Sequence, residues 1–423
     1  MKELSHVRRV LVWGSLVLIL SLPLKADAGS PIDGSLVISA DSEQEVQPSI
    51  AYNSQRQEYL VVWYNDRAGC DDVRARRVSR TGDLLGSPFY VSAGCPADRR
   101  YPDVAYNSAH DQYLVVWEQH EAASGNSIKA RRVSGTGQVL DTTDIPIRSA
   151  GYNTYTPVKP AVSYASTSDR YLVVWAETWH PLPIIHDVFG QVVTQSGALE
   201  GSRFTISEGT GNDVRDEPDV AYNRHANRYI VVWQQKAGSL WDIHGQQVHG
   251  GGGLYQGDIT IAYYTISSTA PAVAAIPTTP SNYKFLVVWE ANLPTHRDIY
   301  GRVIEEGGTL APTELLIAWT GVDQSAPAVA GNESGDRYLV TWRQSQGVVD
   351  VPIYGRSIAY DGTFQDVFHI GGPATDFPAV AAGATGDFFV AWQDQPVWAT
   401  NTNLYGQLWG NRVYLLPLLR NAP

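Results

Sequence analysis

The chain has 423 residues, of which 11% are aromatic and 17% charged, and its formal net charge is −12. The aromatic content excludes a disordered chain, and the acidic balance argues against a partner rich in phosphates, so no nucleic-acid partner is expected. The 38 glycines and 24 prolines are typical of a fold with many tight turns, such as an all-β fold of short strands.

Residues 1–28 predict a secretory signal peptide. Basic residues near the start precede an apolar stretch over 10–24, and residues 26–28 (Ala-Asp-Ala) form a small-x-small cleavage site. A membrane anchor is the alternative, but the apolar stretch is shorter than the ~20 residues that span a bilayer. No later stretch could span a membrane. We therefore expect a secreted or cell-envelope-associated, extracytoplasmic protein whose mature part begins near Gly29.

One pattern recurs seven times along the rest of the chain. Each copy opens with a proline and an apolar strand, crosses a short polar turn, and continues with a run such as residues 59–63 (Tyr-Leu-Val-Val-Trp). A third segment follows, as in residues 298–302 (Asp-Ile-Tyr-Gly-Arg), and then a glycine-rich turn and a fourth apolar segment. The motif tryptophans are 50 to 58 residues apart, and they are Trp63, Trp117, Trp175, Trp233, Trp289, Trp342 and Trp392.

Four short strands per copy predict one blade of a β-propeller, so the chain predicts an all-β, seven-bladed β-propeller with four antiparallel strands per blade. The Tyr-Leu-Val-Val-Trp run is apolar on both faces, as a strand between two neighbouring blades requires. Glycine or alanine in the third strand leaves room over the backbone, which we expect a tryptophan or tyrosine ring to fill. The propeller is predicted over residues 29–410, with a C-terminal tail over 411–423.

The ring is expected to close with strands from both ends of the chain. Residues 36–39 resemble a fourth strand yet precede the first copy, and the last copy ends at its third strand near Trp409. The simplest arrangement makes residues 36–39 the outer strand of the seventh blade, which would protect the ring from opening. The alternative is that residues 413–416 pair back through a tight turn at 410–411.

The order Pro-x-Val-Ala-Tyr, Tyr-Leu-Val-Val-Trp and Asp-Ile-Tyr-Gly-Arg resembles the repeats of exported bacterial seven-bladed β-propellers of unassigned function. It is also similar in order to the propeller repeats of the periplasmic Tol-system protein and of WD-like proteins. The resemblance covers residues 35–410 and implies a fold rather than an activity, because the repeated residues are those that build blades. The Trp-Asp dipeptide of true WD repeats is absent from the motif positions, as is the Ser-x-Asp-x-Gly-x-x-Trp box of sialidase propellers.

In a propeller, the loops between the second and third strands share a face with the loops between blades. Both classes are long and varied in this chain, and we call this the long-loop face; the loops between the first two strands are short and uniform. Function tends to lie on varied loops over a rigid frame, so we expect the binding site there. Cys70 and Cys95 both fall on this face, and export makes a disulfide between them the favoured interpretation over two free thiols or half a metal site.

Two sets of side chains on the long-loop face are candidates for binding. Trp179, Trp241 and Trp398 lie in loops after the second strand, where they could stack on a sugar or hold a peptide, or could fill gaps between blades. Carboxylates just beyond the second strand form the other set, which is Glu118, Glu177, Glu290 and Asp394. Two carboxylates roughly 5–9.5 Å apart could serve a glycosidase, whereas solvation of the rim is the simpler explanation.

The motifs of common enzyme classes are absent from the sequence. No phosphate-binding loop, nucleophile elbow or dinucleotide fingerprint occurs, so neither a cofactor nor a metal site is predicted. We therefore expect a non-enzymatic, monomeric binding or scaffold module for a protein or carbohydrate ligand. The alternatives are a carbohydrate-active enzyme, either a glycosidase or a polysaccharide lyase that uses the rim carboxylates, and a purely structural envelope component.

Overall fold

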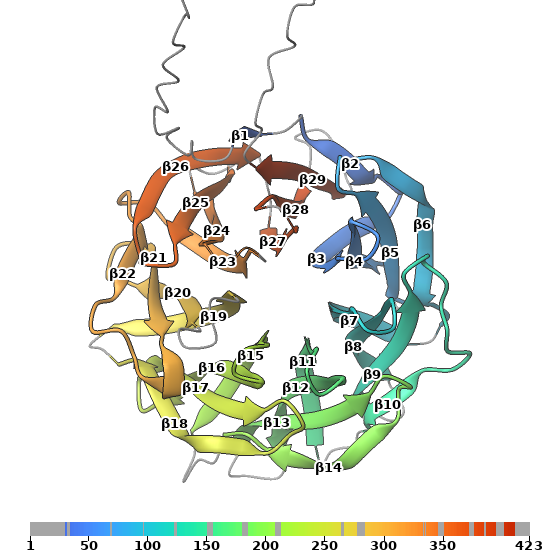
Figure 1. The fold of residues 1–423 in the computed structure, drawn as a ribbon, viewed down its shortest axis with the longest axis horizontal. Coiled ribbons are helices and arrows are strands. Elements are labelled where there is room, and N and C mark those ends of the chain that lie inside the picture. Colours follow the sequence, from blue (N-terminus) through green and yellow to red (C-terminus); the bar gives the residue numbers. More distant parts are fainter. Residues whose placement is uncertain are drawn as a thin grey trace, which may run out of the picture.

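The computed structural model describes residues 30–31, 34–67, 70–95, 97–121, 125–149, 155–179, 185–207, 213–263, 266–276, 284–332, 334, 336–345, 351–371, 376–384, 386–394 and 402–410. These residues form a closed ring of antiparallel sheets around a central opening (Figure 1). The predicted signal peptide and the predicted tail over 411–423 lie outside the described residues. Within the described ranges no helix is long and apolar enough to cross a membrane.

Each blade has four main strands, which follow one another from the centre of the ring to its outer wall, and the seventh blade carries the short β1 as a fifth. Blade one comprises β3 (Gln44–Asn53), β4 (Glu58–Asp66), β5 (Asp72–Ser79) and β6 (Leu84–Ser92). Blade two comprises β7 (Asp98–Asn107), β8 (Gln112–Glu121), β9 (Gly125–Ser134) and β10 (Ile145–Arg148). Blade three comprises β11 (Tyr155–Ala165), β12 (Arg170–Trp179), β13 (Ile185–Thr194) and β14 (Leu199–Thr205). Blade four comprises β15 (Val214–Asn223), β16 (Arg228–Ala237), β17 (Leu240–His249) and β18 (Leu254–Ala262). Blade five comprises β19 (Ser267–Ile276), β20 (Lys284–Asn292), β21 (Arg297–Ile304) and β22 (Leu315–Ala318), with the 3-10 turn η1 (Glu306–Gly308) before β22. Blade six comprises β23 (Gln324–Gly331), β24 (Arg337–Gln344), β25 (Ile353–Ala359) and β26 (Phe364–Gly371). Blade seven comprises β27 (Asp376–Ala382), β28 (Phe388–Asp394), β29 (Asn403–Gly410), β2 (Leu36–Ser39) and the short β1 (Ser30–Pro31).

The prediction of seven four-stranded blades is confirmed. Blades three and four are continuous only through one parallel pair, His186 with Val214, and each otherwise keeps its own antiparallel ladder. The ring closes as expected, because β2 pairs antiparallel with β29 and so supplies the outer strand of the seventh blade. β1 pairs with the far end of β29, Ser30 opposite Gly410. The alternative closure through 413–416 lies outside the described residues.

The second strand of each blade forms the centre of the packing between blades. The motif tryptophans on these strands are among the largest fully buried side chains of the described chain. Several stack on an aromatic ring of the third strand, as Trp289 does on Tyr300 with ring centroids 6.4 Å apart. The apolar run is therefore buried on both faces because each blade packs against two neighbours.

The third-strand glycines accommodate a different side chain from the one expected. A Cβ added to Gly301 would lie 2.7 Å from Ile317 Cδ1 and 3.1 Å from the carbonyl oxygen of Val287. Gly245 has Ile261 Cδ1 in the equivalent place, at 2.9 Å. The space over these glycines is thus filled by an isoleucine of the outer strand, and the prediction of a tryptophan or tyrosine ring is wrong.

The predicted disulfide is present. Cys70 and Cys95 are bonded, with their Cα atoms 5.2 Å apart. Cys70 precedes β5 and Cys95 follows β6, so the bond joins a loop within blade one to the loop that leads into blade two. Both loops belong to the long-loop face, as the sequence indicated.

Candidate active site at the channel mouth

The innermost strands of all blades run in the same direction, so equivalent residues form rings around a central channel. Two positions beyond the opening proline, every blade carries isoleucine or valine. This apolar ring separates a cavity of about 550 Å³ at the long-loop end from a cavity of about 560 Å³ at the opposite end. Both cavities are lined in part by Ile50, Val162 and Val380 of this ring.

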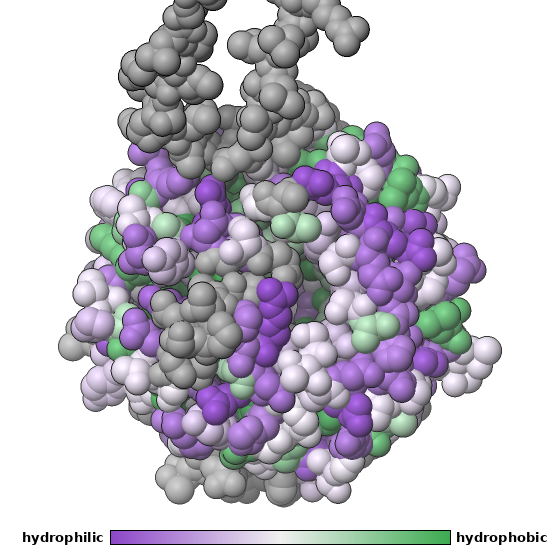
Figure 2. Space-filling view, in the orientation of Figure 1, coloured by the Kyte–Doolittle hydropathy of each residue, from purple (hydrophilic) through white to green (hydrophobic). Residues whose placement is uncertain are grey.

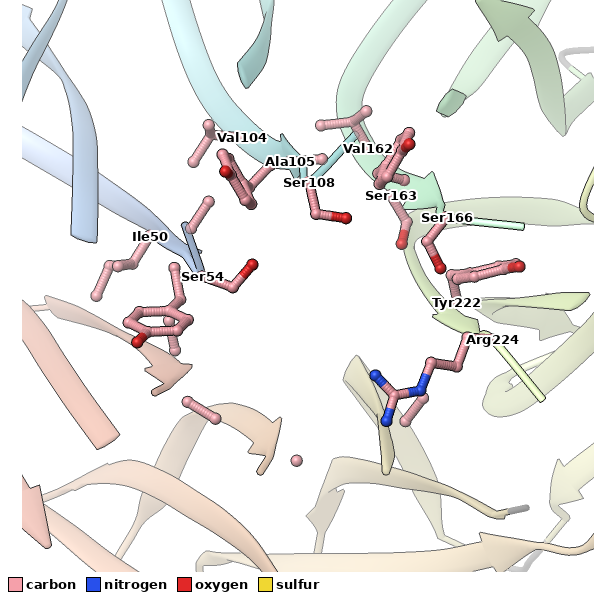
Figure 3. A pocket seen from close by; sticks show the side chains of 18 of the residues that line it. Ile50, Ser54, Val104, Ala105, Ser108, Val162, Ser163, Ser166, Tyr222 and Arg224 are labelled. Carbon is pink, nitrogen blue, oxygen red and sulfur yellow. The ribbon is translucent and has the colours of Figure 1, made fainter. Parts of the chain in front are cut away.

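The cavity at the opposite end is lined by small and hydroxyl-bearing residues. Ser54, Ser108 and Ser166 of the first three blades and Arg224 of the fourth project toward the opening (Figure 3). No carboxylate is among its described lining residues. Acid–base chemistry by carboxylates therefore belongs to the other cavity, at the long-loop end, which we call the channel mouth.

The rim of the channel mouth is built by a β-bulge that repeats in every blade. The residue before the opening proline has a positive φ of 47° to 54° in all seven inner strands, and these residues are Gln47, Tyr101, Lys159, Glu217, Ala270, Ala326 and Phe377. The ladder between first and second strands shifts register at the same point, for instance between Val46 and Ser49. A left-handed conformation costs a non-glycine residue about 1–2 kcal/mol, and such strain is common at functional sites.

Hydrogen bonds from the preceding blade hold several of these bulges in place. The Lys159 N–H donates to Glu118 Oε2 (3.1 Å), and the Ala326 N–H donates to Glu290 Oε1 (2.7 Å). The Gln47 N–H donates in the same way to Gln393 Oε1 (3.0 Å). The residue directly after a motif tryptophan thus supports the bulge of the next blade.

This arrangement gives Glu118 and Glu290 a supporting position beneath the rim. Burial raises the pKa of Glu118, and the Lys159 N–H and ammonium partly offset that effect. Glu290 also accepts a hydrogen bond from Arg297 Nη1 (3.1 Å). Neither of these predicted carboxylates is among the lining residues of the mouth cavity.

Glu177 and Asp394 lie one residue further along, in blades three and seven. Glu177 is fully buried, accepts the indole N–H of Trp175 (3.1 Å) and forms a two-point ion pair with Arg148 (2.7 and 3.0 Å). Asp394 Oδ1 has no hydrogen-bond partner among the described residues, and burial raises the pKa of this carboxyl to about 6. The four predicted carboxylates therefore lie in blades two, three, five and seven, and none of them is among the described lining residues of the mouth cavity.

Of the three predicted tryptophans, only Trp241 has a described side chain. It is half-buried at the second position of β17, with Lys236 Nζ 5.7 Å from its ring centroid. Its backbone N–H donates to Ser267 Oγ of blade five (3.3 Å). The side chain of Trp179 and the whole of Trp398 lie outside the described residues.

Three carboxylates that the sequence analysis did not single out line the mouth cavity: Glu217 on the rim, and Asp103 and Asp219 just beyond the opening prolines. The two aspartates each directly follow an opening proline, where the other blades carry serine or alanine. Asp103 accepts the Ser49 hydroxyl (2.6 Å) and the Val162 N–H (2.7 Å). Asp219 accepts the backbone N–H of the adjacent Val220 and the backbone N–H of Val273 in the next blade (2.8 Å). A comparison of the repeats column by column would have found both.

The environment of these two carboxyls favours retention of a proton. Burial raises the pKa of Asp219 to about 6, and the negative charge of Asp103 contributes to the shift despite hydrogen bonds that oppose it. Burial likewise raises the pKa of Asp103. Burial therefore keeps a proton on Asp219 into the weakly acidic range.

A charged pair lies above them on the rim. Lys159 Nζ contacts Glu217 Oε1 directly and lies 3.4 Å from Asp216 Oδ2. Burial would lower the pKa of the Lys159 ammonium, but Glu217 and Asp216 outweigh it and the pKa is raised. Burial also raises the pKa of Glu217, although Lys159 opposes this. Within the described residues no group of three or more His, Cys, Asp or Glu side chains is placed to hold a metal ion.

Comparisons with known proteins identify the fold. No family model and no curated protein matches the sequence. A protein of unknown function from Dyadobacter fermentans is 10% identical with a TM-score of 0.53, covering 91% of this chain and 100% of its own. An α-L-arabinofuranosidase from Fusarium graminearum is 12% identical (TM-score 0.51; 78% of this chain, 98% of its own). An α-L-arabinanase from Penicillium chrysogenum is also 12% identical (TM-score 0.50; 90% and 98%).

These neighbours support a β-propeller, and they do not support the predicted resemblance to Tol-system and WD-like repeats. Two of the three are carbohydrate-active enzymes. The expectation of a non-enzymatic binding or scaffold module is therefore corrected, because the neighbours favour the alternative of a carbohydrate-active enzyme. At these identities the likeness itself carries the fold, so an argument for catalysis has to come from the chemistry of the site.

Proposed function

We propose that the protein is a glycoside hydrolase that binds its glycan at the channel mouth on the long-loop face. The observation that carries this proposal is the pair Asp103 and Asp219, whose carboxyls share one cavity and have raised pKa values. Glycosidases use one carboxyl that still holds its proton and a second that is ionised. A protonated Asp219 and an ionised Asp103 would supply the two forms.

The roles follow from the environments of the two groups. Asp219, with a pKa raised to about 6, donates its proton to the leaving oxygen as the glycosidic C–O bond breaks. Asp103, whose negative charge is stabilised by the Ser49 hydroxyl and the Val162 N–H, accepts a proton from the water that attacks the anomeric carbon. The pair thereby ends with the same number of protons as it began.

Side chains on the rim supply the contacts that a sugar needs. Tyr101 and Phe377 line the cavity, and Phe377 is 41% exposed, so both rings can stack on a sugar face. The Lys159 and Glu217 pair offers a hydrogen-bond donor and an acceptor to hydroxyl groups. A polysaccharide lyase would instead require an unneutralised cation for a uronate, and Lys159 is already matched by two carboxylates.

The glycan is proposed to be met outside the cytoplasm. The predicted signal peptide over residues 1–28 and the Cys70–Cys95 disulfide support this location, since disulfides persist in oxidising compartments. The arabinofuranosidase and arabinanase neighbours suggest which polymers to test first.

The test is reducing-sugar release from arabinan, xylan, galactan and β-glucan by the purified protein. Asp219→Asn and Asp103→Asn are each expected to lower kcat by about 10²-fold or more, the usual contribution of acid–base catalysis. Asp258→Asn is the matched control, because Asp258 lies in β18 on the outer wall and contacts His244. Thermal melts establish that the variants remain folded. Folded Asp219→Asn and Asp103→Asn proteins with wild-type rates, or no cleavage of any polymer by the wild type, would refute the proposal.

A further inference from the structure

Two aromatic residues stand exposed at the outer end of the long-loop face. Tyr263 follows β18 of blade four and Trp319 follows β22 of blade five. Their side chains are 76% and 52% exposed, the highest values for large apolar side chains in the described part of the chain. The two residues occupy the same place in the repeat, directly after an Ile-Ala pair.

The blade does not need an aromatic ring at this position. The equivalent residues of the other copies are small or polar, and they are Ala40, Ala93, Ser149, Glu208 and Gly372. An exposed ring contributes little to folding, because its apolar surface remains in water. Two such rings on adjacent blades therefore indicate a ligand rather than a packing requirement.

Trp319 is held in a fixed orientation. The Arg356 guanidinium of blade six lies over its ring, with Cζ 5.3 Å from the centroid. Arg356 is itself anchored by hydrogen bonds to the carbonyl oxygens of Ile317 (2.7 Å) and Gln365 (2.9 Å). Because the cation fixes the ring, little conformational entropy is lost when a ligand stacks on the remaining exposed surface.

The two smallest bulge residues lie on the same side of the ring. Five of the seven bulge residues line the mouth cavity, and the two that do not are Ala270 and Ala326, of blades five and six. Ala270 comes seven residues after Tyr263, and Ala326 comes seven residues after Trp319. Seven residues reach at most about 25 Å, so each connecting loop brings an exposed ring and a small rim residue within that distance.

We propose that Tyr263 and Trp319 form an outer binding site for an extended, neutral polysaccharide chain that enters the channel mouth across blades five and six. The inference rests on the proposed glycoside hydrolase function and adds the substrate class, a polymer rather than a short oligosaccharide. The apolar faces of successive sugar units stack on the rings. On the face that Figure 2 shows, apolar side chains are scattered among polar ones. Two separate rings suit a sugar better than a protein interface, which requires a contiguous apolar patch.

The experiment measures binding and cleavage separately. Migration of the protein is followed in native gels that contain arabinan, xylan, galactan or β-glucan, and cleavage of the best polymer is compared with cleavage of arabinobiose or the corresponding disaccharide. The double variant Tyr263→Ala, Trp319→Ala is expected to weaken polymer retardation and raise the KM for polymer about tenfold, with disaccharide cleavage unchanged. Tyr90→Ala is the control, because Tyr90 is 49% exposed but lies on β6 of blade one.

The outcomes separate this inference from the proposed function. Undiminished retardation of the folded double variant, or no retardation of the wild type by any polymer, overturns the outer site. Retardation that depends on the two rings, in a wild-type protein that cleaves nothing, supports the outer site and refutes the hydrolase. Cleavage that depends on Asp219 but not on Tyr263 or Trp319 supports the hydrolase and refutes the outer site.

Discussion

Glu45 should make the stability of the closed ring depend on pH. It lies fully buried in β3, at the seam between the first and seventh blades. Its N–H donates to Thr402 Oγ1 (3.1 Å), and its Oε2 accepts the Leu404 N–H (3.1 Å). Burial raises the pKa of this carboxyl from 4.5 to about 7; the nearby Glu43 adds to the shift, and Arg76 opposes it.

The size of the effect follows from the difference between the two pKa values. Below pH 4.5 the carboxyl is neutral in both folded and unfolded chains, and it has no effect. Between pH 4.5 and 7 the unfolded chain loses the proton first, so the free energy of unfolding falls as the pH rises. At about 1.4 kcal/mol per pKa unit, the full loss is about 3 kcal/mol, reached above pH 7.

Glu45→Gln removes the ionisation but keeps an oxygen for the Leu404 N–H. We expect the variant to match the wild type at pH 4.5 and to exceed its stability by about 3 kcal/mol at pH 8. The measurement is the urea midpoint at both pH values, followed by tryptophan fluorescence. Glu305→Gln, at a residue whose side chain is 47% exposed, is the control. A stability difference that is the same at both pH values, or a variant that is weaker at pH 8, would contradict the reasoning.

Three further predictions concern the disulfide, a buried ion pair and the proposed acid. Replacing Cys70 and Cys95 by serine opens a 25-residue loop and should lower the stability by about 3.5 kcal/mol, seen as a lower melting temperature that reductant no longer changes. Glu177→Ala leaves the half-buried Arg148 without its partner and should cost about 3 kcal/mol in urea unfolding, whereas an effect under 1 kcal/mol would show that the pair is dispensable. If Asp219 is the acid, kcat should fall as the pH rises through about 6, and a rate that stays level to pH 8 would assign the acid elsewhere.

The fold could be predicted because the repeated residues are the ones that build it. Trp63 and its equivalents predict the buried second strand of each blade. Residues 36–39 match a fourth strand closely enough to predict how the ring closes. The error at Gly301 shows the limit of such reasoning. The sequence indicates that space is needed over the backbone, but only the packed sheet shows that Ile317 of the outer strand fills it.

The site was harder to predict because its chemistry depends on contacts between blades. Glu118 follows a motif tryptophan and looks exposed in the sequence, yet the Lys159 N–H of the next blade lies 3.1 Å away. Asp103 and Asp219 lie within apolar strands, where the sequence alone predicts that an aspartate side chain faces solvent. Burial in the channel raises the pKa of both carboxyls, the charge of Asp103 adds to the shift at Asp219, and neither effect is local in the chain.

The repeated bulge before the opening proline has a consequence for how this molecule could change its specificity. Each blade holds one residue at the rim of the mouth in the same unusual backbone conformation, and the chain already places Gln, Tyr, Lys, Glu, Ala and Phe at this position. Because the conformation is set by the following proline and the neighbouring blade, the identity of that side chain is nearly independent of the sheet beneath it. The propeller thus offers seven exchangeable sites on one circle, at which selection or design could alter ligand preference and leave the interior untouched.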